Sequence, residues 1–524
     1  MRPRATAPTF CCVFFLVTIC PLSLLRATPS PSDFRTLAVQ YENQPISDQG
    51  DGTFLNPIIP GHYHDPTVVR VGEDYYLTHC EHDKRGPLIW HSRDLVNWRP
   101  LARVASVANL NDIWATDLVY HDGLFYLYLP IRQATIDGQL TFSNVVVTAK
   151  DPAGPWSAPI DLGIGGIDPG HVVDRNGTRY LYVNAGKVVK LSPDGLSTVG
   201  EQIEVYPGWE IPPDWTIECH CLESPKLFWR DGWCYMVSAQ GGTAGPSTSH
   251  MIVVARSRSA LGPWENDPDS PFLRTWQRSE PWWSQGHGTF IEDTAGDWWV
   301  MFHAIAHGRR SGGRSTLLLP LQWTDDGWPY LPDEASAEVL LRKPAGTNVG
   351  HGMPLSDTFA GSDLGPQWDP GETVENFNQT YCMSGGALQM AAKGDSLYNA
   401  TRLLGLPVNP SYELTVEVNT SAGNAAGLGI FAATFTGIET TSGGVSHPRR
   451  GNNFLPDLYP DQHVFLKVRH RDHDVTFYHS ADGENWTLFP WGASTSTEST
   501  QRIGIYASGS GTVQFRHFTY RGLP

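Results

Sequence analysis

Hydrophobic and polar residues follow a repeated β pattern through the first two thirds of the chain. Five segments share a turn followed by a strand rich in aromatic residues, at 72–77, 122–127, 176–181, 231–236 and 295–300. The Asn-Gly and Asp-Gly pairs at three of these turns are favoured in hairpins because both residues tolerate positive φ. A short apolar strand precedes each turn, so each unit opens with a β-hairpin.

The five units recur about every 50–65 residues, slightly longer than the ~40–50 residues of common propeller blades. Repeated all-β units of this size favour a radial β-propeller, and five units predict five blades over residues 51–345. A β-sandwich whose turns resemble one another by chance is the alternative.

A different pattern begins near residue 355. Alternating strands such as 412–418 and 474–478 each have one apolar face, and turns rich in Gly and Ser separate them. This alternation predicts a second domain, a two-sheet β-sandwich over residues 355–524. The predicted fold class is therefore all-β, a five-bladed β-propeller followed by a jelly-roll, concanavalin-like β-sandwich.

The N-terminal residues have the pattern of a targeting segment. Arg2 and Arg4 precede an almost wholly apolar run from Cys11 to Leu25, with a small residue at Ala27. This pattern predicts a secretory signal peptide over residues 1–27, followed by an N-terminal extension over 28–50. A signal anchor is the alternative, although the apolar run is short for a membrane span of about 20 residues.

Composition and cysteine usage agree with an extracellular, non-membrane protein. The net charge of −17 disfavours nucleic acid as a partner, because nucleic-acid binding needs a basic surface. Five Asn-x-Ser/Thr sequons predict glycosylation of a secreted product, at Asn176, Asn378, Asn399, Asn419 and Asn485. The five cysteines beyond the signal segment predict at most one or two disulfides and at least one free thiol.

Polar residues recur at one position of the repeat. Six to nine residues before each turn glycine, the first strand of the unit starts with Asp65, Asp117, Asp168, Glu223 or His287. Because the first strand of each blade lines the central channel, we expect these five side chains to converge at one end of the axis. An Asp before Pro is also common as a turn or cap residue, so each acid taken alone has a structural alternative.

Crowded carboxylates repel one another, and their pKa values move apart. Such a pair suits hydrolysis of glycosidic bonds, which needs one ionised carboxylate to activate water and one protonated carboxyl to protonate the leaving oxygen. A third carboxylate can tune the acid. A cation site is the other common explanation of such an arrangement.

From about Asn56 to Arg342 the chain resembles glycoside hydrolase family 43, whose members are similar to β-xylosidases and α-L-arabinofuranosidases. The matching motifs are Asn-Pro-Ile-Ile-Pro-Gly-His-Tyr-His-Asp-Pro at 56–66, Trp-Ala-Thr-Asp at 114–117, Asp-Pro-Gly at 168–170, Glu-Ser-Pro-Lys-Leu at 223–227, Gly-His-Gly at 286–288 and Gly-Arg-Ser-Thr at 313–316. Residues 355–520 resemble, more loosely, the sandwich that follows the propeller in many xylosidase-type members.

The resemblance implies an inverting mechanism. It makes Asp65 the general base, Asp168 the residue that tunes the pKa of the acid, and Glu223 the general acid.

The resemblance also implies a sugar pocket. Arg314 matches an arginine that reaches the sugar, Trp114 matches a pocket wall, and Asp117 and His287 are further candidates for substrate binding. His287 also matches a histidine that supports a calcium ion through water in several members, so calcium bound near His287 is the one predicted cofactor. The alternatives are a surface ion pair for Arg314, blade packing for Trp114 and a core histidine for His287.

Three residues depart from the usual family pattern: His64, Thr116 and Ser224. They change the pocket lining and leave the acids in place, so they put the substrate in doubt rather than the reaction. The first hypothesis is an exo-acting hydrolase of xylose- or arabinose-containing hemicellulose, with an oligosaccharide or polysaccharide as its partner. The alternatives are galactan or galactofuranoside linkages in the same fold, and a carbohydrate-binding protein without turnover.

Overall fold

The computed structural model describes residues 41–80, 84–108, 110, 112–133, 140–371, 377–441, 444–448, 454–456, 458–459 and 461–524. The predicted signal peptide (1–27) and most of the predicted extension (28–50) lie outside the described residues. Within them, no helix is both long and apolar enough to cross a membrane.

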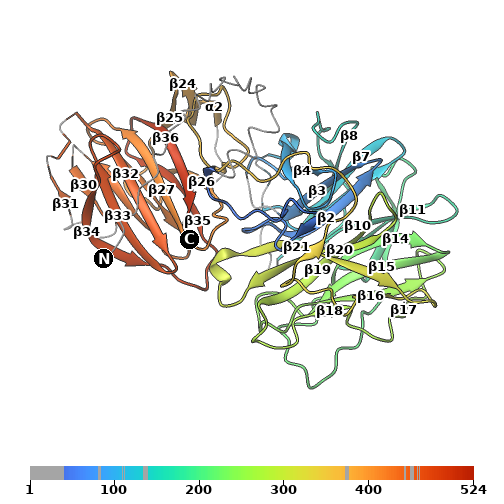
Figure 1. The fold of residues 1–524 in the computed structure, drawn as a ribbon. Helices are drawn as coiled ribbons and strands as arrows, with labels where there is room; N and C mark the ends of the chain where they lie inside the picture. Colours follow the sequence, from blue (N-terminus) through green and yellow to red (C-terminus); the bar gives the residue numbers. More distant parts are fainter. Residues whose placement is uncertain are drawn as a thin grey trace, which may run out of the picture.

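Five antiparallel sheets follow one another along the chain, and each is built from consecutive strands (Figure 1). The first three blades contain β2 (His64–Val71), β3 (Asp74–Cys80), β4 (Leu88–Ser92) and β5 (Arg99–Arg103); β6 (Asp117–His121), β7 (Leu124–Arg132), β8 (Phe142–Ala149) and β9 (Ile160–Asp161); and β10 (Gly170–Val173), β11 (Arg179–Val183), β12 (Lys187–Leu191) and β13 (Thr198–Glu204). The fourth contains β14 (Glu223–Arg230), β15 (Trp233–Gln240), β16 (Met251–Ser257), β17 (Glu265–Asn266) and β18 (Leu273–Arg274), and the fifth β19 (Trp282–Glu292), β20 (Trp298–Ala306), β21 (Arg314–Trp323) and β22 (Pro329–Tyr330).

The first strands of the blades lie next to one another around the axis, with β2 in contact with β6 and β19, and β14 in contact with β10 and β19. The chain closes the ring from its N-terminal side. Ile59 forms a β-bridge to Thr316 of the last blade, and β1 (Thr53–Phe54) pairs with β23 (Leu341–Arg342). The repeat of turns and aromatic strands thus forms hairpins within blades, and the predicted fold class is confirmed.

The C-terminal part is a sandwich of a seven-stranded and a six-stranded antiparallel sheet. The first sheet contains, in spatial order, β24 (Tyr381–Ser384), β25 (Ala387–Ala391), β36 (Thr512–Gly522), β27 (Tyr412–Asn419), β32 (His463–Arg471), β33 (Asp474–Ser480) and β34 (Thr487–Ser494). The second contains β26 (Thr401–Gly405), β35 (Arg502–Ser508), β28 (Ala425–Phe431), β29 (Thr436–Thr441), β30 (Gly444–Ser446) and β31 (Phe454–Leu455). Burial alternates along β27, as expected for one face packed on a core. Within the described residues, the helices with given bounds are α2 (Phe377–Thr380) and two short 3-10 turns, η1 (Ala105–Val107) and η2 (Arg310–Gly312).

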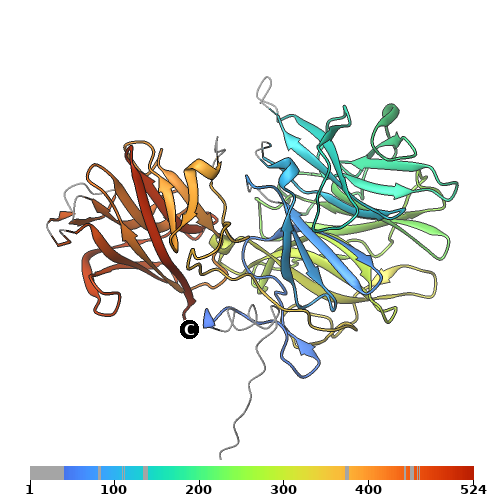
Figure 2. The same cartoon turned by 90° about the horizontal axis from the view of Figure 1, so that it is seen from above.

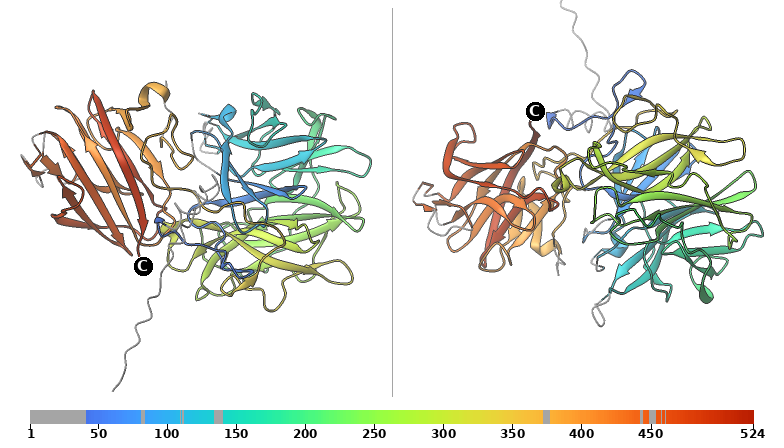
Figure 3. Two further views of the ribbon diagram at one scale, coloured as in Figure 1. Left: turned by 45° about the horizontal axis from the view of Figure 1, so that its top comes forward. Right: turned by 90° about the horizontal axis from the view of Figure 1, so that it is seen from below.

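The sandwich lies directly beside the propeller (Figures 2 and 3). Buried apolar side chains from blades 1, 4 and 5 and from the sandwich form one continuous core. At the edge of blade 1, the Arg85 guanidinium donates to the carbonyls of Gly365 and Trp368, at 2.8 and 2.9 Å, and Arg103 donates to the carbonyl of Pro366 at 2.6 Å. Buried contact and polar contacts together fix the sandwich against the end of the propeller that carries the start of β2.

Candidate active site

Local irregularities at the strand starts turn the predicted side chains toward the axis. The pairing register shifts between His64 and Thr67, between Glu223 and Lys226, and between Gly286 and Thr289. Such β-bulges re-aim side chains and are common next to active sites.

Three predicted site residues also occupy the left-handed backbone region: φ is 56° at Asp65, 51° at Asp168 and 55° at His287. Left-handed backbone in residues other than glycine stores strain and clusters at functional sites. Tight packing explains two glycines of the motifs: a Cβ on Gly170 would lie 1.8 Å from the carbonyl oxygen of Pro225, and one on Gly286 would lie 1.9 Å from the ring of His250. The motifs therefore fix backbone shape as well as chemistry.

Cationic and imidazole groups surround Asp65. Its Oδ1 accepts a hydrogen bond from Arg314 Nη1 at 2.8 Å and lies 2.8 Å from His303 Nδ1, while its Oδ2 lies 2.7 Å from His64 Nδ1. Burial opposes the ionisation of Asp65, but Arg314 and the histidines outweigh it and hold the pKa of this carboxyl well below its usual range. Asp65 is therefore ionised.

Carboxylates have a larger effect on Glu223 than the cation that acts on it, Arg314. Carboxylate oxygens of Asp168 and Glu223 and a ring nitrogen of His287 all lie within 4.8 Å of one another. Burial, followed by the charges of Asp168 and Asp65, raises the pKa of Glu223 well above its usual value. Burial and the charge of Asp65 also raise the pKa of Asp168 to about 7. Near neutral pH the axis thus holds an ionised carboxylate and a protonated carboxyl.

Asp117 and Trp114, two further predicted site residues, have different surroundings. Lys226 Nζ donates to Asp117 Oδ1 at 2.9 Å, and the backbone N–H of His171 donates to Oδ2 at 2.7 Å. Asp117 thus links three blades, and sugar binding by it stays a prediction. Trp114 is half-buried, with its ring 4.8 Å from that of Phe142.

Two histidines at the site were not among the predicted site residues. His303 and His64 both contact Asp65, and burial, as the largest cause, lowers the pKa of each imidazole to about 3. Both are therefore neutral. His64 could have been found as a departure from the family motif beside Asp65, whereas His303 lies on a second strand and has no local signal.

The groups around His287 decide whether a calcium ion fits there. A second group of potential ligands there is made of imidazoles only, from His250, His287 and His303, while calcium prefers oxygen ligands. The nearby carboxylate oxygens belong to Asp65, Asp168 and Glu223, the three residues that the family resemblance makes catalytic. These residues do not fit a calcium ion held directly by protein oxygens; an ion held through water near His287 stays a prediction.

The sandwich contributes to a cavity beside the site. This cavity of about 250 Å³ is lined by His64 and Arg103 from the propeller and by Gln367, Asp369 and Arg502 from the C-terminal part. Since His64 contacts Asp65, the cavity reaches the immediate neighbour of the proposed base.

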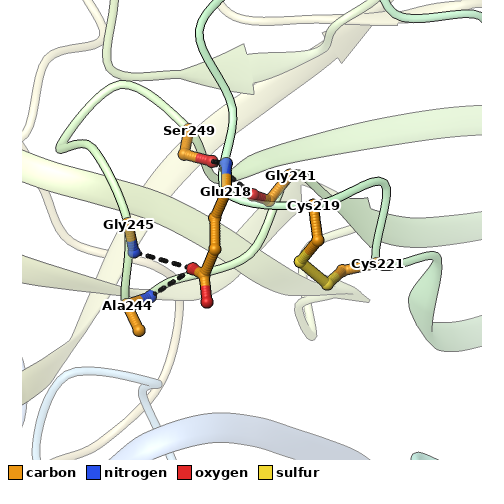
Figure 4. The surroundings of a disulfide bond; sticks show 7 residues. All are labelled: Glu218, Cys219, Cys221, Gly241, Ala244, Gly245 and Ser249. Atoms are coloured by element: carbon orange, nitrogen blue, oxygen red, sulfur yellow. Dashed lines mark hydrogen bonds between the residues drawn. A yellow bond between two sulfur atoms is a disulfide. The ribbon is translucent and has the colours of Figure 1, made fainter.

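A disulfide lies in the segment that leads into Glu223 (Figure 4). Cys219 and Cys221 are joined to each other. Next to them, Glu218 Oε2 accepts hydrogen bonds from the backbone N–H groups of Ala244 and Gly245, both at 2.7 Å. The remaining cysteines described by the structure, Cys80, Cys234 and Cys382, are free thiols.

Fold and site together define a class of protein: a five-bladed propeller with an acid–base pair of carboxylates at one end of its axis. Comparison with known proteins places the chain within this class. Residues 54–329 match the profile of "Glycosyl hydrolases family 43", and the chain belongs to this family.

Similar proteins include a xylan 1,3-beta-xylosidase from a Vibrio species, 30% identical over 56% of this chain and 60% of its own length. A non-reducing end alpha-L-arabinofuranosidase from Bacteroides ovatus is 30% identical over 60% of each chain, so the chain matches about three fifths of the length of these relatives. The crystal structure of a xylan beta-1,4-xylosidase from Bacillus halodurans superposes with a TM-score of 0.78 at 25% identity, over 89% of this chain and 99% of that one.

Proposed function

We propose that this protein is a secreted, inverting, exo-acting glycoside hydrolase that releases terminal β-D-xylosyl or α-L-arabinofuranosyl residues from hemicellulose. The observation that carries the proposal is the difference in contacts: Asp65 touches Arg314, His64 and His303, whereas Glu223 lies beside Asp168. Arg314 and three histidines favour the ionised form of Asp65, and burial beside Asp168 favours the protonated form of Glu223.

In this mechanism, Asp65 takes a proton from a water molecule as the water attacks the anomeric carbon. Glu223 gives its proton to the leaving oxygen, as a general acid must. An inverting pair needs about 6.5–9.5 Å between its carboxyl groups to leave room for the water. Arg314 holds Asp65 in its ionised form and orientation, and Asp168 raises the pKa of Glu223.

The names of the relatives support the choice of sugar, since they are xylosidases and an arabinofuranosidase. Secretion is supported by the apolar N-terminal run and by the sequons. All five sequon asparagines are exposed, so each is accessible to glycosylation.

A panel of 4-nitrophenyl glycosides tests the proposal. We expect release of nitrophenol from the β-D-xylopyranoside, the α-L-arabinofuranoside or both, and little from the galactosides. Proton NMR of the first-formed sugar should show the anomeric configuration opposite to that of the substrate. Retention of configuration, or turnover of galactosides alone, would reject it.

A further inference from the structure

Three tryptophans form a continuous row on blade 4, and the proposed mechanism does not use them. The ring centroids of Trp209 and Trp215 lie 5.7 Å apart, and those of Trp215 and Trp276 lie 5.6 Å apart. Trp209 and Trp215 are half-buried, whereas Trp276 is 59% exposed. We call Trp209, Trp215 and Trp276 the tryptophan row.

Arg274 and Glu280 hold the tryptophan row in place. The Arg274 guanidinium lies 3.6 Å from the ring centroid of Trp215 and 5.0 Å from that of Trp276. Arg274 is only 6% exposed, and its Nη2 donates to the carbonyl of Thr248 at 2.6 Å. Glu280 accepts a hydrogen bond from the backbone N–H of Trp276 at 2.9 Å. Together the three neighbouring rings form a contiguous aromatic surface, and contiguous apolar surface marks interaction sites where a single exposed residue does not.

The strand register of blade 4 places the row beside the proposed acid. Glu223 pairs with Ala239, and the next residue, Gln240, exchanges two hydrogen bonds with the backbone of Trp209, at 2.8 and 3.0 Å. The row therefore begins one residue away from the partner of Glu223.

From there the row runs outward across the sheet. Gln240 pairs with Met251, and Met251 pairs with Arg274 under the far end of the row. Neighbouring strands are about 4.8 Å apart, so the two spacings from β15, whose Gln240 binds Trp209, to β18 cover about 10 Å. That span is longer than a single sugar ring.

The side of the site on which the row lies identifies its ligand. A general acid protonates the oxygen of the leaving group, so the leaving part of the substrate lies on the side of Glu223. The segment with Trp209 and Trp215 leads directly into Glu223, and the Cys219–Cys221 disulfide lies between Trp215 and Glu223 (Figure 4). Two of the three tryptophans and the acid thus lie on one segment of the chain, and Trp276 joins them from the end of β18.

We propose that the tryptophan row binds the leaving part of an oligosaccharide or polysaccharide through contacts of its mutually tilted rings with the apolar faces of sugar rings, the exposed Trp276 making the outermost contact. The proposal rests on the proposed function, because it places the bound sugars on the acid side of the bond that is cut. It makes the protein an enzyme of longer chains, with binding that extends beyond the first leaving-group sugar.

The test measures hydrolysis of a disaccharide and of a tetrasaccharide by the full-length protein. Both are xylo-oligosaccharides or both arabino-oligosaccharides, according to which aryl glycoside is the better substrate. For Trp276→Ala we expect the ratio of kcat/KM on the tetrasaccharide to that on the disaccharide to fall about tenfold, since an aromatic contact is lost. Trp276→Phe, which keeps a ring, should retain most of the ratio. Tyr398→Ala is the matched control, because Tyr398 is 66% exposed and lies in the sandwich; it should keep the native ratio.

An unchanged ratio in Trp276→Ala would overturn the proposal, as would an equal fall in Tyr398→Ala. Failure of the proposed function can be told apart from failure of this proposal, because the native protein would then hydrolyse neither xylo- nor arabino-oligosaccharides. In that case, quenching of tryptophan fluorescence by xylotetraose still decides the role of the row. An affinity for xylotetraose, measured by quenching, that falls about tenfold in Trp276→Ala supports the proposal. Absence of quenching in the native protein rejects it.

Discussion

Asp65 and Glu223 occupy equivalent places in the fold and yet have opposite chemical surroundings. Each lies at the start of the first strand of its blade, beside a β-bulge. Asp65 contacts Arg314, His64 and His303, whereas Glu223 lies beside Asp168. One carboxyl is thereby ionised and the other protonated, so the neighbours from other blades, rather than the residue type or the strand position, assign the roles of base and acid.

The largest effect is expected from removing the ionised carboxylate. Asp65→Ala should lower kcat by about 10²–10⁴-fold on both an aryl glycoside and a natural disaccharide, because water is no longer activated for either. Steady-state assays on the two substrates check this, with Asp325→Ala, at an exposed turn of blade 5, as the control. A loss confined to one substrate would break the assignment of Asp65 as the base.

Removing the protonated carboxyl should give a loss that depends on the leaving group. Glu223→Ala should lower kcat by about 10²–10⁴-fold on a natural disaccharide and far less on a 4-nitrophenyl glycoside, whose leaving group needs little protonation. The ratio of the two losses is the measurement. Near-normal hydrolysis of the disaccharide would show that another group is the acid.

A smaller effect is expected when the charge of Asp168 is removed. Activity falls as pH rises through the pKa of Glu223, because the acid must be protonated. Burial is the largest cause of its raised pKa and Asp168 the next, so Asp168→Asn should move the basic limb of kcat to lower pH by about one unit or more. The pH–rate profile checks the shift, and a basic limb that stays in place would separate Asp168 from the tuning of Glu223.

The smallest effect is expected from removing the imidazole of His64, which lies beside Asp65. His64 Nδ1 lies 2.7 Å from Asp65 Oδ2, and its loss weakens the ionised form of Asp65. Activity falls as pH decreases through the pKa of the base, so His64→Ala should move the acidic limb of kcat/KM to higher pH, by less than about one unit, because Arg314 and His303 remain. His517→Ala, exposed in the sandwich, should leave the limb in place; a shift of the acidic limb to lower pH in His64→Ala would contradict this account.

Much of the architecture is determined by local sequence signals. The turn at Asp231-Gly232 and the aromatic strand after it form the hairpin of β14 and β15, and such signals predict blades because turn conformation and side-chain alternation depend on neighbouring residues. The same repeat brings Asp65, Asp168 and Glu223 to one end of the axis. The alternation along 412–418 likewise predicts a sandwich strand, observed as β27.

Tertiary structure alone decides the electrostatics and the surfaces. Arg314 and His303 reach Asp65 from about 240–250 residues away in the chain, and no local pattern encodes that contact. Trp215 and Trp276 meet only because β18 pairs with β16. The sequence by itself determines which carboxyls gather on the axis, since spacing within a repeat is local. Which of them is charged depends on burial and on groups from other blades, because pKa values respond to distance in space rather than along the chain.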